Sequence, residues 1–211
     1  MSETPKLILL RHGQTGDNVL NILSGRNDIA LTGKGVEQAV AAGALLKSYR
    51  IDKVFSSPLQ RAFNTAALAL KGAGMQDIII ERRNEIIEAD SGEFTGCAFA
   101  FDKVGKCQIG GGPSGSPFAD WDCIHDTRMP GGESDQDVVT RVRNFFASHV
   151  LPRLQEGESV MVVAHVAILR AFDIVLGTEP APEPGQRTPF KLVPNAMPIV
   201  FEYKDNGLSP V

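Results

Sequence analysis

Short apolar runs separated by polar turns recur along the whole chain and predict alternating strands and helices. Continuous apolar residues predict buried strands at 6–10, around Val54 and Phe55, and at 77–83, 159–165 and 197–204. Between them, apolar residues spaced for one helical face predict helices over 32–49, 59–70, 132–154 and 166–176. This alternation predicts an α/β fold, a three-layer sandwich in which helices flank a largely parallel central sheet. The pattern does not give the order of the strands.

Several helix starts carry a local signal. Thr32 is a good cap for the first long helix, and Ser134 and Asp137 have the spacing of a capping box. Pro58 falls at the predicted start of the second helix, where its missing N–H costs little. This placement puts Arg61 in the first turn of that helix.

The stretch from about 92 to 132 differs from the rest of the chain. It has little periodicity, carries GGGPSGSP at its centre and holds the only Trp, Trp121. Long loops in a compact domain are usually lids or binding loops, so we expect a cap over a site. The sequence shows no linker between domains. The Pro-rich run 179–189 lies too near the end of the chain to divide two domains and suits a surface crossover. The sequence therefore predicts one domain over 1–211 with a cap at about 92–132.

Composition limits the partners. Lys and Arg total 21 against 25 Asp and Glu, a formal net charge of -4, so the chain has no overall basic field for nucleic acid or an anionic membrane. The three cysteines suit reduced thiols better than a disulfide framework. There is no leader-like N-terminus and no apolar run of roughly 18 residues. We expect a soluble, cytoplasmic protein in which any anion site is local.

Two histidines and two arginines lie directly after predicted strands or in the turn that follows them. His12 follows Arg11 at the end of the first strand, His165 opens a helix, and Arg61 lies in a third strand-to-helix turn. Ligands of open α/β sheets gather outside the carboxyl ends of strands. Each histidine alone could be a satisfied structural residue, but together with two guanidinium groups they predict a phosphate site.

The residues around these positions resemble a known family. The blocks LILLRHGQTGDN, LSGRNDIALTGKG, SSPLQRAFNTA, EIIEADSGEFTG, PGGES, VVAHVAILRAF and MPIVFEY follow one another as in the histidine phosphatase superfamily, in its phosphoglycerate mutase-like branch. Only about residues 97–128 have no clear counterpart. The resemblance implies metal-independent phosphoryl transfer through a phosphohistidine.

The resemblance also implies roles for single residues. His12 matches the nucleophile, and Arg11, Arg61 and His165 match residues around the phosphate. An imidazole attacks only when neutral, and nearby guanidiniums favour the neutral form. Thr15, Asn18, Ser24 and Gly25 match positions that line the pocket or meet the rest of the substrate, although loop hydrogen bonding is an alternative role for Thr15 and Asn18. Val166 stands where the family commonly has glycine, which puts the substrate range in question.

Cleavage of a phosphate ester needs a proton for the departing alkoxide. The resemblance points to Glu88, after the third strand, as this acid, with Glu85 and Glu93 as rivals. Glu85 could be a surface residue, and Glu93 follows Gly92 in the expected entrance loop. A neighbouring phosphate dianion should raise the pKa of the acid, which would help it to donate near neutral pH.

The shared core does not separate phosphatases from mutases. A mutase must hold a phosphorylated carboxylic acid, yet residues 89–131 contain three basic residues, Lys103, Lys106 and Arg128, against six acidic ones. Arg26 replaces an aromatic residue of the family, and Arg26, Arg82 or Arg83 could supply the missing positive charge.

We therefore expect hydrolysis of a small phosphorylated metabolite, with phosphoglycerate mutase as the alternative. An inactive module that binds phosphorylated ligands is a third possibility. No metal or cofactor is expected, and 2,3-bisphosphoglycerate would be needed as a primer only by a mutase. The sequence leaves the oligomeric state and the roles of the cysteines open.

Overall fold

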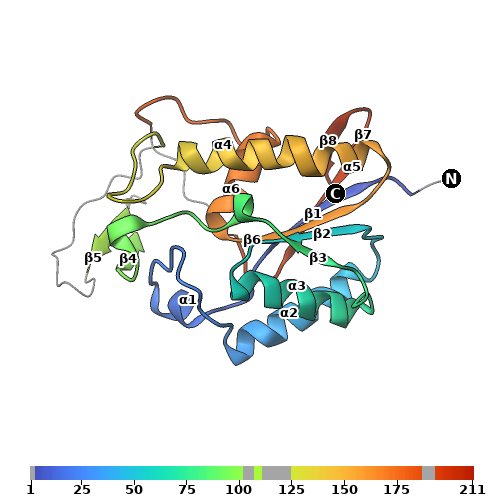
Figure 1. The fold of residues 1–211 in the computed structure, drawn as a ribbon, viewed down its shortest axis with the longest axis horizontal. Coiled ribbons are helices and arrows are strands. Elements are labelled where there is room, and N and C mark those ends of the chain that lie inside the picture. Colours follow the sequence, from blue (N-terminus) through green and yellow to red (C-terminus); the bar gives the residue numbers. More distant parts are fainter. Residues whose placement is uncertain (1–2, 102–106, 111–124, 187–192) are drawn as a thin grey trace.

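A computed structural model describes residues 3–101, 107–110, 125–186 and 193–211 (Figure 1). Its main sheet has the strand order β3-β2-β6-β1-β7-β8. The first four of these strands run parallel, whereas β7 is antiparallel to β1 and β8 is antiparallel to β7. The predicted α/β fold with a largely parallel sheet is confirmed. The strands are β1 (Lys6–Arg11), β2 (Lys53–Ser56), β3 (Ile80–Arg82), β6 (Val160–Ala164), β7 (Pro198–Lys204) and β8 (Gly207–Pro210).

Helices cover both faces of this sheet (Figure 1). Helices α2 (Gly33–Leu46) and α3 (Gln60–Ala73) pack on one face, and α4 (Asp135–Phe145) and α6 (Val166–Val175) on the other. Successive side chains of a strand point to opposite faces. Accordingly, Leu7 and Leu9 of β1 join the core beneath α4 and α6, while Ile8 and Leu10 join the core beneath α2 and α3.

Two glycines let α2 and α3 approach closely. A Cβ atom on Gly43 would collide with the carbonyl oxygen of Ala69, and one on Gly72 would lie 2.6 Å from the carbonyl oxygen of Val40. The helix pair therefore packs backbone against backbone, which fixes the position of α3 relative to the sheet. Arg61 lies in the first turn of α3, as predicted.

Two helix boundaries differ from the prediction. A helix was expected over 132–154, and it begins at the predicted cap, Ser134, whose capping box with Asp137 is present. It is not continuous, because a π-helical stretch, Phe146–Val150, separates α4 from α5 (Leu151–Gln155). Pro152 explains the interruption, because proline has no N–H to donate to the preceding turn. Helix α3 begins at Gln60, so Pro58 lies before it and not in its first turn.

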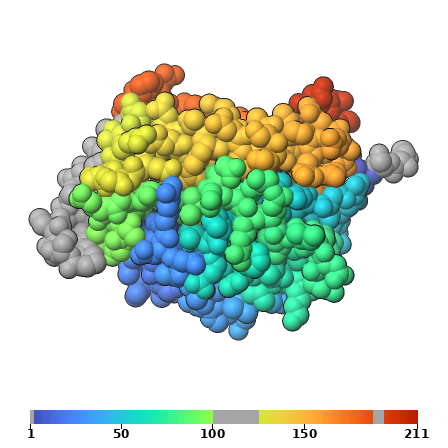
Figure 2. Space-filling view, in the orientation of Figure 1, coloured from blue at the N-terminus to red at the C-terminus, as the bar shows by residue number. Residues whose placement is uncertain are grey.

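The described part of the predicted cap contains short elements that the sequence pattern did not predict. A 3₁₀ turn, Gly92–Phe94, leads to an antiparallel hairpin of β4 (Ala98–Phe101) and β5 (Cys107–Gly110). Residues 102–106 and 111–124 of the predicted cap lie outside the described residues. Strand β4 and the residue before it are bonded to the loop after α1 (Gly16–Leu20). The N–H of Leu23 donates to the carbonyl of Cys97, and that of Phe99 to the carbonyl of Asn21. The two segments adjoin in the space-filling view (Figure 2).

None of the helices in the described ranges combines the length and the apolar character needed to cross a bilayer.

Candidate active site

The sheet order brings the two predicted histidines together. Strands β1 and β6 are parallel neighbours in which Arg11 pairs with Ala164, so His12 and His165 follow at the same sheet edge. The N–H of His12 donates to the carbonyl of Ala164 at 3.0 Å, and the two imidazole rings lie 5.2 Å apart between centroids. Two histidines separated by most of the chain thus form one buried pair.

The hydrogen bonding of His12 leaves one ring nitrogen available. Its Nδ1 lies 2.7 Å from the carbonyl oxygen of Gly13, and a carbonyl can only accept, so Nδ1 carries the proton. Nε2 therefore holds the lone pair of the neutral ring. Burial, reinforced by the guanidiniums of Arg61 and Arg11, lowers the pKa of His12 to about 3, against the opposing effect of the Gly13 bond. His12 is thus an unprotonated nitrogen base at neutral pH.

Arg11 and Arg61 present buried guanidiniums to this pair. Arg11 donates to the carbonyl of Val193 at 2.6 Å, and Arg61 donates to the carbonyls of Asn27 at 2.6 Å and Gly25 at 2.9 Å. These bonds fix both side chains while consuming only part of their donor capacity. Within the described residues, the Nε atoms of both arginines and Nδ1 of His165 are buried without a hydrogen-bond partner. Unsatisfied buried donors are costly, and an anion would satisfy them.

Glu88 is the glutamate that the structure brings to the arginines. Burial lowers the pKa of both Arg11 and Arg61, and the negative charge of Glu88 acts in the opposite direction on each of them. Burial raises the pKa of the Glu88 carboxyl itself, although both guanidiniums act in the opposite direction. Glu88 lies beyond the end of β3, because a 3₁₀ turn, Asn84–Ile86, intervenes.

The two rival glutamates lie elsewhere. The Glu85 carboxylate is 3.7 Å from Nε2 of His149, and Glu93 is exposed. Of the three glutamates, Glu88 is the one whose charge acts on the pKa of both buried arginines. This makes Glu88 the candidate for proton exchange with a group bound beside them.

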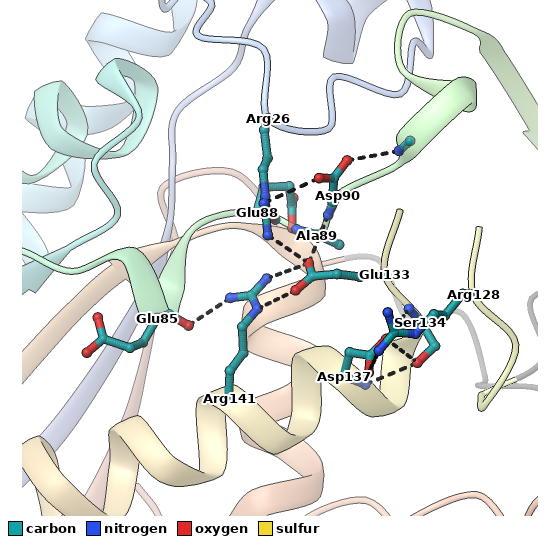
Figure 3. Close-up of polar contacts among 11 residues, drawn as sticks. Arg26, Glu85, Glu88, Ala89, Asp90, Arg128, Glu133, Ser134, Asp137 and Arg141 are labelled. Atoms are coloured by element: carbon teal, nitrogen blue, oxygen red, sulfur yellow. Dashed lines mark hydrogen bonds and ion pairs between the residues drawn. The ribbon is translucent and has the colours of Figure 1, made fainter. Parts of the chain in front are cut away.

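A network of charged side chains fixes the segment that carries Glu88 (Figure 3). Arg141 of α4 donates to the carbonyl of Glu85 at 2.7 Å and forms a two-pronged pair with Glu133 at 3.0 and 3.1 Å. Glu133 in turn accepts the N–H of Asp90 at 2.9 Å. Both ends of the segment 85–90 are thus held to α4 through one arginine–carboxylate pair.

Arg26 is bound into the same network. Its guanidinium lies 3.3 Å from the Asp90 carboxylate and 3.2 Å from that of Glu133, and its Nε lies 3.4 Å from the carbonyl of Glu88 (Figure 3). Arg26 thus pairs with Asp90 and shares the Glu133 carboxylate with Arg141.

The two other cations considered from the sequence are engaged away from the buried arginines. The Arg82 guanidinium lies 3.9 Å from the centre of the Phe63 ring, and Arg83 pairs with Glu81. All three cations considered as sources of extra positive charge are thus already engaged with other side chains.

The remaining predicted pocket residues have structural bonds. Thr15 and Asn18 form a reciprocal capping box at the start of α1, the alternative role considered from the sequence. Gly25 has a φ of 47°, in the region that favours glycine, and its carbonyl accepts from Arg61. The carbonyl of Ser24 accepts the N–H of Asn27, and Val166 is the first residue of α6.

Three side chains that the sequence pattern did not indicate form hydrogen bonds with the site residues. Thr65, one turn after Arg61, accepts the N–H of Gly13 at 2.9 Å and donates to the carbonyl of Arg61 at 2.6 Å. Asn195 donates to the carbonyl of His12 at 2.8 Å, and the Ser57 hydroxyl lies 2.7 Å from Nε2 of His165. Only the one-turn spacing from Arg61 to Thr65 could have suggested such a contact from the sequence.

The described residues contain no group of three or more His, Cys, Asp and Glu side chains suited to hold a metal ion. They do contain two buried neutral imidazoles, two guanidiniums and a buried carboxyl group that influence one another electrostatically. This set is suited to binding a tetrahedral oxyanion and transferring its central atom to nitrogen.

Comparison with known proteins agrees with this chemistry. The sequence profile described as "Histidine phosphatase superfamily (branch 1)" matches residues 7–209. A 2,3-bisphosphoglycerate-dependent phosphoglycerate mutase of Methylobacterium radiotolerans is 38% identical over 174 residues, which cover 81% of this chain and 78% of the mutase.

Solved structures extend the likeness. A mycobacterial glucosyl-3-phosphoglycerate phosphatase, solved in complex with VO3, is 25% identical with a TM-score of 0.70, covering 98% of this chain and 97% of the phosphatase. A phosphoglycerate mutase from Bacillus anthracis shares the fold, with a TM-score of 0.74 at 21% identity over 100% of this chain and 92% of the mutase. Phosphatases and mutases thus both occur among the similar proteins.

Proposed function

The chain belongs to the histidine phosphatase superfamily, and we propose that it hydrolyses a small phosphomonoester through a phosphohistidine on His12. The observation that favours hydrolysis over mutase activity is the engagement of Arg26, which pairs with Asp90 and with Glu133, a carboxylate that it shares with Arg141. A phosphorylated carboxylic acid needs a free cation besides Arg11, Arg61 and His165, the proposed phosphate clamp, and Arg26 is already paired.

In the first proposed step, Nε2 of His12 attacks phosphorus, an N–P bond forms, and the P–O bond to the alcohol breaks. Arg11, Arg61 and His165 donate hydrogen bonds to the phosphoryl oxygens as negative charge moves onto the leaving oxygen. Glu88 gives its proton to that oxygen. Burial raises the pKa of Glu88, which supports its presence as an acid at the start of the step.

In the second proposed step, the Glu88 carboxylate takes a proton from water as the water oxygen attacks phosphorus. The N–P bond breaks, inorganic phosphate leaves, and His12 returns with Nε2 unprotonated. Burial and the two guanidiniums lower the pKa of His12, so its ring leaves phosphorus as a neutral imidazole at physiological pH. The route needs no metal or cofactor, because imidazole is itself the phosphoryl acceptor.

The substrate that we propose is a small phosphorylated metabolite. The similar proteins support this size class, since their names refer to phosphoglycerate and glucosyl-3-phosphoglycerate.

Mutase activity is the second candidate, and the 38% identity to a phosphoglycerate mutase is the observation in its favour. A mutase would return the phosphoryl group to the other hydroxyl of the substrate, and it would need 2,3-bisphosphoglycerate as primer. The two activities therefore differ in the fate of the phosphohistidine, which reacts with water in one case and with a bound hydroxyl in the other.

One assay separates these activities. Purified protein is incubated with 3-phosphoglycerate, with and without catalytic 2,3-bisphosphoglycerate, while inorganic phosphate and 2-phosphoglycerate are followed together. A parallel reaction with p-nitrophenyl phosphate reports general phosphatase activity, and the His12→Asn variant is the control in both. We expect phosphate release that depends on His12. Isomer formation without phosphate release would identify a mutase, and no His12-dependent turnover in either reaction would support an inactive binding module.

A further inference from the structure

His165 uses its two ring nitrogens differently. Its side chain is completely buried, and Nε2 lies 2.7 Å from Oγ of Ser57. Nδ1 is also buried and has no hydrogen-bond partner among the residues that the structure describes. Because Nε2 is already engaged, Nδ1 is the nitrogen left for a ligand beside His12.

The surroundings of Ser57 decide which of the two groups donates. Ser57 is fully buried, and its Oγ already accepts the N–H of Leu59 at 3.3 Å. The only acceptor that the described residues offer to the Ser57 hydroxyl proton is Nε2 of His165. If Nε2 donated instead, this buried O–H would be left unsatisfied, which is unfavourable. Ser57 therefore donates and Nε2 accepts.

An accepting Nε2 fixes the state of the ring. Burial and the positive charges of Arg61 and other neighbours lower the pKa of His165 well below its usual value, so the imidazole is neutral. A neutral imidazole has one N–H, and with Nε2 accepting it must be at Nδ1. The opposite tautomer would place a lone pair at Nδ1, which would repel a phosphoryl oxygen there.

We propose that Ser57 is a positioning residue that holds neutral His165 in the Nδ1–H tautomer, so that this imidazole donates to an oxygen of the phosphoryl group on His12. The inference deepens the proposed function and rests on it for the identity of the ligand. Topology supplies the pair, because β2 and β6 are parallel neighbours and Ser57 follows β2 as His165 follows β6. The N–H of Ser57 donates to the carbonyl of Val163 at 3.0 Å, which fixes the serine backbone.

The test measures the tautomer without turnover. Nitrogen-15 spectra of labelled resting enzyme report the protonation of each ring nitrogen, and the His165 signals are assigned by their absence in His165→Asn. Titration calorimetry with inorganic phosphate gives the affinity of the pocket. We expect wild-type His165 to be protonated at Nδ1 and bare at Nε2. Ser57→Ala should yield a mixture of tautomers and weaken phosphate binding roughly tenfold, the loss of one hydrogen bond.

Two further variants control for structural effects. Ser57→Thr keeps the hydroxyl and should restore both readouts. Ser159→Ala removes a buried serine hydroxyl at the opposite end of β6, where it accepts the N–H of Lys6, and should change neither.

A wild-type His165 protonated at Nε2 would overturn the proposal, as would Ser57→Ala spectra and affinity equal to wild type. If Ser57→Ala does not fold, the wild-type spectrum still decides the tautomer. The expected tautomer and phosphate affinity in a protein without phosphatase activity would refute the proposed hydrolysis and leave the role of Ser57 standing.

Discussion

The buried neutral state of His12 should make the fold sensitive to mild acid. In the unfolded chain a histidine takes up a proton near pH 6.5, whereas in the folded protein the pKa of His12 is about 3. Between these values the unfolded state binds more protons, so acid favours unfolding. The stability that His12 contributes is present above about pH 6.5 and is lost as the pH falls toward 3.

The size of the effect follows from this window. Each pH unit inside it costs about 1.4 kcal/mol, so lowering the pH from 7 to 5 should remove about 2 kcal/mol through His12 alone. His12 is only 4% exposed, so water does little to stabilise the charged imidazolium in the folded protein. His165, whose pKa is also lowered, adds a contribution of the same sign.

The assay is urea unfolding of wild type and His12→Asn at several pH values between 7 and 5. Other titrating groups are common to both proteins, so the difference between the two slopes of unfolding free energy against pH isolates His12. We expect the variant to lose about 2 kcal/mol less than wild type over this range. Equal slopes would mean that His12 takes up its proton in the folded state as readily as in the unfolded chain, and the argument from burial would be wrong.

Three further substitutions test other parts of the structure. Gly43→Ala should lower the unfolding free energy by about 1–3 kcal/mol in urea denaturation, because the new Cβ would collide with the Ala69 carbonyl. Gly33→Ala is the control, since Gly33 has open space around it and the substitution should not destabilise the protein. Equal effects of the two substitutions would contradict the close helix packing. Glu88→Gln should slow the hydrolysis of alkyl phosphates by about 100-fold or more in steady-state assays. Hydrolysis of p-nitrophenyl phosphate should slow much less, because nitrophenolate leaves with little need of a proton. Equal losses of rate for both substrates would show that Glu88 is not the acid. Glu133→Gln should lower the unfolding free energy by about 2 kcal/mol, as bonds to two guanidiniums weaken, and an unchanged urea midpoint would show that the network contributes little.

The layers of the fold were predictable from the sequence because buried parallel strands and amphipathic helices carry strong local patterns. Strand β1 is an apolar run, and the capping box at Ser134 is visible in four residues. The short strand β8 was missed, although Asp205 and Asn206, both with positive φ, precede Gly207 in a turn typical of hairpins. The π-helical stretch before α5 was missed because the apolar spacing of the helix continues through it.

The availability of a charged group is harder to predict than its presence. Arg26 is a visible cation in the sequence, where it was one of three candidates to supply positive charge for binding a carboxylate. In the structure it is shared between Asp90, which follows Glu88 closely, and Glu133, which lies more than a hundred residues along the chain. Its partners depend on the packing of α4 beside the segment 85–90, which no local pattern encodes.

The residues of the proposed phosphate clamp could be named from the sequence, but their proximity could not be predicted, because it depends on the order of the strands. Adjacent parallel strands β2, β6 and β1 place Ser57, His165 and His12 in a row at one sheet edge, and α3 adds Arg61 from the turn after β2. A different strand order would leave the same residues at strand ends but separate them by one or more strand spacings of about 4.8 Å. The residue types therefore suggest the chemistry, while the position of β6 between β1 and β2 brings these residues together, as the proposed binding of a single phosphoryl group requires.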